Sequence, residues 1–174
     1  MYRISDKYSL LKQLLITSIF SAIAIILNYI FSTLIKSDIF GIPFYAIPII
    51  IVSLFFGPFF GVGSAFVVDL LSTLLSGYSY LPLFALGTIM WGLVPGVFSR
   101  YIKDTVTLSI AIVSSHVLVT LFNTLSIYIY FTLESALTTL FLRILMIPIN
   151  SLVIIIIIKV IIGRILIYES KNNS

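Results

Sequence analysis

The chain is dominated by long apolar runs, separated by short polar breaks or by breaks that contain glycine and proline. These runs cover approximately Leu10–Ile35, Pro43–Phe56, Gly61–Leu75, Leu81–Ser99, Thr107–Phe131 and Leu137–Ile167. A helix of about 20 apolar residues is long enough to cross the ~30 Å hydrocarbon core of a bilayer. The pattern therefore predicts an all-α integral membrane protein, built as a bundle of six transmembrane helices.

Two of the predicted helices, Pro43–Phe56 and Gly61–Leu75, are short for a full crossing. Between them, Gly57-Pro58 and Gly61 predict a tight turn, because Pro lacks a donor N–H and Gly accepts positive φ. Pro95-Gly96 is expected to interrupt the fourth helix. Small residues at the start of the third helix favour close packing of backbones. Such a helix pair fits either simple tight packing or the base of an outward-facing cavity.

The composition agrees with a membrane location. Hydrophobic residues make up 60% of the chain and charged residues 9%, whereas about 25% of a soluble domain is charged. The absence of Cys excludes disulfides and thiolate chemistry. Six spans use nearly all of the 174 residues, so we interpret residues 1–174 as a single transmembrane domain with a polar tail from about Glu169.

The basic residues predict the orientation of the bundle. Of the ten Lys and Arg residues, Lys36 alone falls in an outer loop and Arg143 lies within a span. The others gather at the opposite ends of the spans, and such ends face the cytoplasm. Both termini are therefore expected in the cytoplasm, with the chain spanning the cell membrane several times and surrounded by lipid. The basic residues are dispersed rather than clustered in a patch, so we expect no nucleic-acid partner.

Two charged residues fall where hydrocarbon does not tolerate charge. Asp69 lies near the middle of the third span, and Arg143 lies about two turns below the outer end of the sixth. Such residues face protein, water or ligand, which makes each a functional candidate. The alternative is a purely structural pair, between Asp69 and Arg143 or between either residue and His116.

Other polar and aromatic residues converge on the outer half of the predicted bundle. At a rise of ~1.5 Å per residue, Asn123 and Arg143 lie on the order of 10 Å below the outer surface. Apolar walls with a few polar groups are typical of a small-molecule pocket. The candidate substrate-binding residues are Tyr29, Asp69, Tyr80, Trp91, Asn123, Arg143 and Asn150. Alternative roles are an interfacial aromatic belt for the tyrosines, core packing for Trp91, and a bond from Asn150 to the backbone freed by Pro148.

Enzymatic and metal chemistry have little support in the sequence. His116 is the single histidine and has no Cys or carboxylate companions at ligand spacing. We expect it to pack in the bundle or to hydrogen-bond Asp69. No Ser–His–Asp spacing, zinc-protease motif or phosphate-binding glycine loop is present. The sequence therefore predicts neither an enzyme nor a bound metal or cofactor.

The first span carries a second feature. Ser18 and Ala22 are four residues apart, so these small side chains form a groove on one helix face. The groove lies in the inner half of the membrane, away from the predicted pocket. It predicts close packing of another helix, either from this bundle or from a partner.

Three stretches together resemble a known family. They are AIPIIIVSLFFGPFFGVGSAFVVDLLS at 46–72, LFNTLS at 121–126 and FLRILMIPINSLVIII at 141–156. In order and spacing they resemble the folate-type substrate-binding (S) components of energy-coupling factor transporters, over most of the chain. The resemblance implies a vitamin-binding subunit with an outward-facing site. It also implies docking on a transmembrane coupling subunit that carries two cytoplasmic ATPases, through a small-residue motif that corresponds here to Ser18-x-x-x-Ala22.

The chain departs from this family pattern around the predicted pocket. Asn28-Tyr29 stands where an Arg is common, Ser126 where an aromatic residue often occurs, and the loop GYSYLPLF replaces a Pro-Gly-Phe pattern. A folate-like compound is the leading ligand, and another vitamin or a modified-base precursor is the alternative. A membrane assembly subunit that transports nothing and an intramembrane enzyme are the remaining alternatives.

Overall fold

The computed structural model describes residues 8–34, 42–102 and 104–172, and within these ranges the chain is helical and contains no strand. The elements are α1 (Leu10–Tyr29), the π-helix η2 (Ile30–Leu34), α2 (Ala46–Phe56), α3 (Pro58–Leu75), α4 (Pro82–Phe98), α5 (Thr105–Tyr130) and α6 (Leu133–Asn172). The predicted all-α bundle is thereby confirmed. The polar break at residues 36–38 and the basic residues Arg3, Lys7 and Lys103 lie outside the described ranges.

The helices differ in their ability to cross a membrane. Among the described residues, four stretches are long and apolar enough to do so: Leu10–Ser32, Pro58–Leu75, Thr105–Tyr130 and Leu133–Arg164. Helices α2 and α4 are shorter, at 11 and 17 residues. Because an 11-residue helix spans only ~17 Å, α2 does not reach across the hydrocarbon core by itself.

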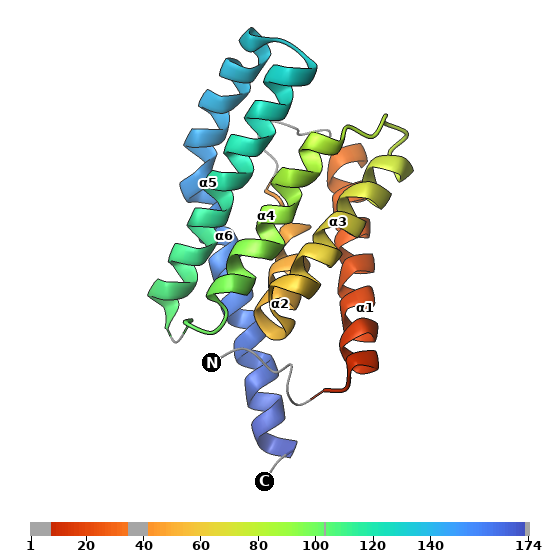
Figure 1. Cartoon of the computed structure of the whole chain (residues 1–174). Helices are drawn as coiled ribbons and strands as arrows, with labels where there is room; N and C mark the ends of the chain where they lie inside the picture. Colours follow the sequence, from red (N-terminus) through yellow and green to blue (C-terminus); the bar gives the residue numbers. More distant parts are fainter. Residues whose placement is uncertain (1–7, 35–41, 103, 173–174) are drawn as a thin grey trace.

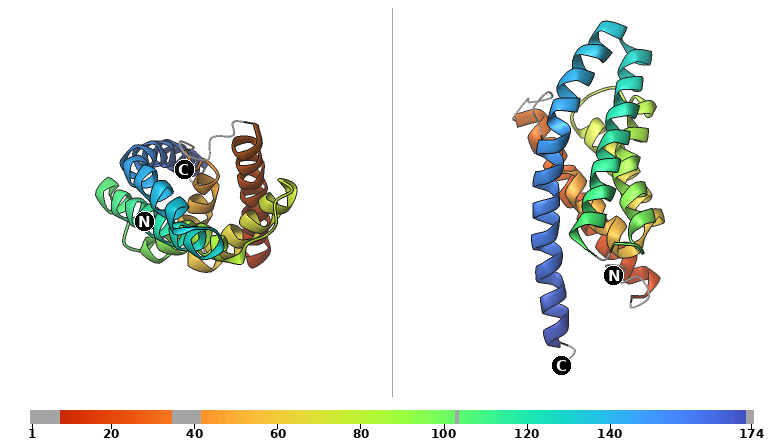
Figure 2. Two further views of the ribbon diagram at one scale, coloured as in Figure 1. Left: turned by 90° about the horizontal axis from the view of Figure 1, so that it is seen from above. Right: turned by 90° about the vertical axis from the view of Figure 1, so that its left-hand side faces the viewer.

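The two ends of the bundle are distinct. Helix α1 begins and α6 ends at the same end of the bundle, as Figure 1 shows, which agrees with an even number of passes. The opposite end holds the α3–α4 and α5–α6 connections and is called the outer end here, following the orientation predicted from the basic residues. Towards its C-terminus, α6 extends beyond the other helices (Figure 2).

Helix α2 forms the centre of the molecule. All of its residues from Ala46 to Phe56 are buried, and α1, α3, α4 and α6 pack around it. A helix that is apolar on every side is stable only when it is enclosed. Viewed from above, α2 lies inside the ring formed by the longer helices (Figure 2).

The connection from α2 to α3 is tighter than predicted. Helix α2 ends at Phe56, Gly57 has a φ of 91°, and Pro58 is already the first residue of α3. Gly61 therefore lies inside α3 and is not part of the turn. The physical reason is that Pro58 starts a helix well, since its fixed φ suits the first turn and its missing N–H needs no partner there.

Pro95 and Pro148 do not break their helices. Helix α4 continues through Pro95, where the sequence predicted an interruption, and α6 continues through Pro148. In a bundle, neighbouring groups can satisfy the carbonyl that a proline leaves without its usual donor.

Both α5 and α6 begin earlier than predicted. Asp104 accepts a hydrogen bond from the Thr107 N–H at 2.8 Å, and Thr132 accepts one from the Ser135 N–H at 3.2 Å, so each caps a helix N-terminus. At its C-terminal end, α6 stays helical to Asn172, within the predicted polar tail.

Helices α2, α3 and α4 meet at a contact made of very small residues. A Cβ added at Gly61 would lie 2.5 Å from the Gly92 carbonyl oxygen and 2.7 Å from Ser53 Cβ. The Ser53 hydroxyl donates a hydrogen bond to the Gly92 carbonyl. Lipid gives little hydrophobic drive between helices, so such close packing and interhelical hydrogen bonds stabilise membrane bundles. We call Ser53, Gly61 and Gly92 the three-helix contact.

We expect Gly92→Ala to destabilise the protein, because the added methyl would overlap the Gly61 backbone. Overpacking of this kind typically costs about 1–3 kcal/mol, and thermal unfolding in detergent would measure it. Gly63→Ala is the matched control, since a Cβ at Gly63 meets nothing within 4 Å. It should leave stability unchanged or raise it slightly, because Ala favours helix over Gly by about 1 kcal/mol. Equal stability of the two variants would contradict the close approach of α3 and α4.

Candidate functional site

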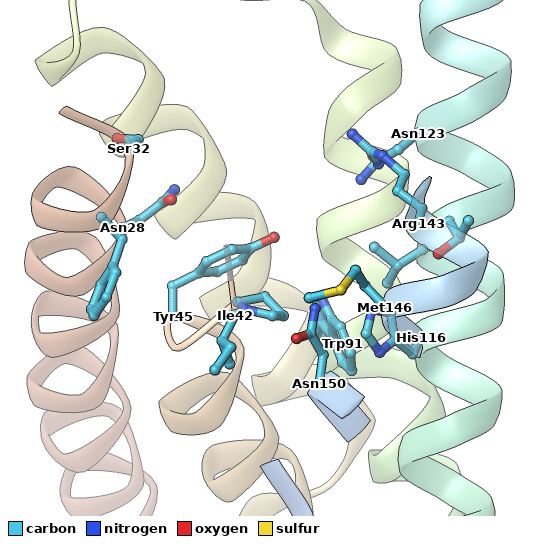
Figure 3. A pocket seen from close by; sticks show the side chains of 14 residues that line it. Asn28, Ser32, Ile42, Tyr45, Trp91, His116, Asn123, Arg143, Met146 and Asn150 are labelled. Atoms are coloured by element: carbon cyan, nitrogen blue, oxygen red, sulfur yellow. The ribbon is translucent and has the colours of Figure 1, made fainter. Parts of the chain in front are cut away.

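A cavity of about 210 Å³ lies toward the outer end of the bundle. It is enclosed by the end of α1 with η2, the segment that leads into α2, and the facing sides of α4, α5 and α6. Its lining residues are Asn28, Phe31, Ser32, Ile42, Pro43, Tyr45, Trp91, His116, Val119, Thr120, Asn123, Arg143, Met146 and Asn150. Figure 3 shows Asn123 and Arg143 toward one end of this cavity, and Trp91, His116 and Asn150 toward the other.

Helical periodicity explains how α5 and α6 supply so much of the lining. On α5, His116, Thr120 and Asn123 are separated by four and three residues, which places them on one face. On α6, Arg143 and Asn150 are two turns apart and therefore also share a face. The two faces meet across the cavity because α5 and α6 are neighbouring antiparallel helices.

The cavity brings together four of the seven predicted substrate-binding residues. Trp91, Asn123, Arg143 and Asn150 line it. Their contact with a substrate stays a prediction, but their shared location agrees with it. Gly87 on α4 makes room for one of them, since a Cβ at Gly87 would overlap the Asn123 side-chain amide.

The other three predicted residues lie outside the lining. Tyr29 is 40% exposed on α1, whereas its neighbour Asn28 lines the cavity. Asp69 lies partly buried on α3, where it accepts a hydrogen bond from the Thr88 hydroxyl at 2.7 Å. Tyr80 precedes α4, and its hydroxyl is buried without a hydrogen-bond partner among the described residues. Burial, and after it the negative charge of Asp69, raises the pKa of Tyr80.

Trp91 and His116 form the aromatic wall of the cavity. Trp91 is fully buried, and its ring lies 5.1 Å from that of His116 at an angle of 55°. His116 Nδ1 lies 3.0 Å from the Ser151 hydroxyl. The expected packing role of His116 is confirmed, but its hydrogen-bond partner is Ser151 rather than Asp69. His116 faces α6 at this point, which the sequence alone does not reveal.

Two polar atoms around the cavity have unused hydrogen-bonding capacity. Asn150 Oδ1 and Trp91 Nε1 are buried and have no hydrogen-bond partner among the described residues. Burying a polar group without a partner costs free energy, so such groups are uncommon unless water or a ligand completes them. The cavity therefore offers a polar ligand one hydrogen-bond acceptor, Asn150 Oδ1, and one donor, Trp91 Nε1.

Sequence reasoning missed several lining residues, among them Tyr45, Thr120 and Met146. Thr120 could have been found, because it is one turn from His116 and nearly one turn from Asn123. Tyr45 carries the one hydroxyl in the run from Pro43 to Val52, which is a weaker signal. Among the described residues, no group of three or more His, Asp or Glu side chains could hold a metal ion.

A second hollow of about 450 Å³ runs between α1 and α3, nearer the inner end than the cavity. It is lined mainly by apolar side chains and contains both Ser18 and Ala22, the predicted docking residues. At its base, the hydroxyls of Ser21 and Ser64 are hydrogen-bonded at 2.7 Å, which joins α1 to α3. We call this hollow the α1–α3 groove.

Comparison with known proteins gives a family for the chain. Neither the search of curated proteins nor that of solved structures produced a match. The family model described as "ECF transporter, substrate-specific component" matches residues 12–168, nearly the whole sequence. Members of this family are membrane subunits that bind a small-molecule substrate and work with a membrane coupling subunit and ATPases; they are not enzymes. The chain therefore belongs to the family of substrate-specific components of energy-coupling factor transporters.

Proposed function

We propose that this chain captures a folate-like compound from outside the cell in the cavity near its outer end. The observation that carries the proposal is the cavity itself, where Arg143, Asn123 and Asn150 share one space with the Trp91 ring. The resemblance to the folate-type components points in the same direction. The single membrane-spanning unit predicted for residues 1–174 fits a subunit of this kind.

The size of the cavity suggests how such a ligand would sit. Pockets that bury a drug-sized ligand usually measure ~300–1,000 Å³, and this cavity, at about 210 Å³, is smaller. We therefore expect it to enclose the pterin ring system, while the remainder of the molecule extends through the opening. Tyr29 and Tyr80 remain candidates for contacts with that outer part. A smaller vitamin or a modified-base precursor is the second candidate. The small volume of the cavity favours such a smaller ligand.

The lining residues have distinct proposed roles. Arg143 carries only donors and can hold a planar oxygen acceptor or a carboxylate with two parallel hydrogen bonds. Asn123 and Asn150 can each donate and accept, which suits the amino and ring N–H groups of a pterin. Trp91 is a better stacking partner than Tyr80, because Trp91 lines the cavity and Tyr80 does not.

We also propose that the α1–α3 groove docks the coupling subunit, which is joined by two cytoplasmic ATPases. The groove contains Ser18, Ala22 and Gly63, whose small size lets another helix approach closely. It is lined by none of the residues that line the cavity. Substrate capture and docking therefore use different faces of the bundle.

Titration of the purified protein with folate should quench tryptophan fluorescence at a submillimolar Kd. Trp91 is the single tryptophan in the sequence and lines the cavity, so the signal reports on that space. Equilibrium binding of tritiated folate would give an independent value of Kd. Affinity no better than millimolar would reject folate, and quenching by a smaller vitamin instead would select the second candidate.

Arg143→Ala should weaken binding of the same ligand about tenfold to 100-fold, because hydrogen bonds to charged groups contribute about 1.5–3 kcal/mol. The control is Arg100→Ala, which removes an exposed cation just after α4 and should leave Kd unchanged. Thermal unfolding of both variants would show that the fold persists. Unchanged affinity in a folded Arg143→Ala protein would refute the role given to Arg143.

Ala22→Phe should abolish co-purification of the coupling subunit and ATPases, because the larger side chain fills the α1–α3 groove. Ligand binding should be unaffected, since the groove and the cavity share no lining residue. The matched control is Ile23→Phe on the same helix, at an exposed position outside the groove. Recovery of the full complex with the Ala22→Phe variant would contradict docking at this surface.

A further inference from the structure

The end of the cavity away from Arg143 is lined by polar side chains that carry no fixed charge. Trp91, His116 and Asn150 lie at this end (Figure 3), and among the described lining residues Arg143 is the one charged side chain. Asn150 is 4% exposed, and its Oδ1 is buried without a hydrogen-bond partner among the described residues. A buried amide oxygen of this kind requires a donor, so this end of the cavity favours a ligand that brings one.

His116 is held at this end of the cavity by a hydrogen bond to α6. Its Nδ1 lies 3.0 Å from the Ser151 hydroxyl, and both side chains are buried. The other ring nitrogen, Nε2, has no hydrogen-bond partner in the part of the chain that the structure describes, and it is not sealed off by protein atoms. Because the imidazole lines the cavity, Nε2 is open to that space.

The Ser151 hydroxyl decides which imidazole nitrogen carries the proton. Among the described residues this hydroxyl has no second hydrogen-bond partner, whereas the Ser115 and Ser126 hydroxyls each donate to a carbonyl of their own helix. A buried hydroxyl proton without an acceptor costs free energy, so Ser151 donates to His116 Nδ1. A second buried cation beside Arg143 would also be costly, so the imidazole is neutral. Its one proton then resides on Nε2, which gives the cavity an N–H donor.

We propose that His116 Nε2 and Asn150 Oδ1 recognise the lactam edge of a cyclic substrate, with Ser151 as the positioning residue that keeps the proton on Nε2. The ring carbonyl accepts from His116, and the ring N–H beside it donates to Asn150. Trp91 Nε1 lies at the same end as a further donor. The inference rests on the proposed function of the cavity and adds a chemical class to it: an uncharged lactam faces this end, while an acceptor group of the substrate faces Arg143.

The first test needs no ligand, because His116 is the single histidine in the sequence. With nitrogen-labelled histidine, NMR distinguishes a protonated imidazole nitrogen from an unprotonated one, and the wild-type protein should carry the proton on Nε2. Ser151→Ala should give a mixture of the two tautomers. Ser115→Ala is the matched control, because this buried hydroxyl bonds the Ala111 carbonyl and not the imidazole. A wild-type proton on Nδ1, or an unchanged spectrum in Ser151→Ala, would overturn the proposal.

The second test measures the Kd of matched probes by equilibrium dialysis. Folate has a lactam edge, and aminopterin replaces the ring carbonyl with an amino group, which exchanges donor and acceptor along that edge. Wild-type protein should bind folate about tenfold more tightly or better, because aminopterin leaves buried polar groups unpaired. His116→Phe keeps a ring beside Trp91 and should bring the two Kd values to within about threefold of each other. Ser115→Ala should preserve the preference for folate.

Hypoxanthine and adenine form a smaller pair with the same exchange of donor and acceptor, which separates this inference from the choice of folate. Tighter binding of hypoxanthine than of adenine, with no binding of folate, would reject the proposed ligand and support recognition of a lactam. Equal affinity for both members of the pair that binds would overturn the inference. A preference for the amino compound, or no binding of any of these probes, would overturn it as well.

Discussion

The close approach of α3 and α4 over the buried α2 helix is the constraint on which the rest of the structure depends. Gly61 and Gly92 allow two backbones to touch, and the Ser53 hydroxyl joins the third helix to this point. Trp91 immediately precedes Gly92, so the same contact fixes the aromatic wall of the cavity. Thr88 lies one turn before Gly92 on α4, where it reaches Asp69 on α3. The packing of small residues thus sets the positions of larger side chains on α3 and α4, Asp69 and Trp91 among them.

The hydrocarbon around a membrane protein explains why its polar side chains are concentrated in a few places. A polar side chain that faces lipid has no hydrogen-bond partner there, which costs free energy. Polar side chains therefore gather where protein, water or ligand can satisfy them. In this bundle one such gathering is the cavity, and another is the Ser21–Ser64 pair beneath the α1–α3 groove. The two lie on different faces. Under the proposed function, this separation allows the cavity to hold a solute while the α1–α3 groove contacts the coupling subunit.

Much of the fold could be read from the sequence, because the hydrophobic pattern and the helix rise per residue set the number and depth of the helices. Depth is why Asn123 and Arg143 were predicted to lie near one another. The rotation of each helix about its axis was not readable, because it depends on packing between helices. For that reason Asn28, and not Tyr29, lines the cavity, and His116 meets Ser151 instead of Asp69. Tyr45 was missed because it precedes α2 in an apolar run, and its place in the cavity lining depends on how α2 packs inside the bundle.

The central claim is that the cavity holds a small polar molecule. Mass spectrometry of compounds retained through purification tests this claim most directly, with Thr120→Phe as the comparison, because Thr120 lines the cavity and the larger ring would fill it. The account predicts a polar heterocyclic compound in the wild-type protein that is absent from a folded Thr120→Phe variant. Equal amounts of the same compounds in both proteins would contradict it.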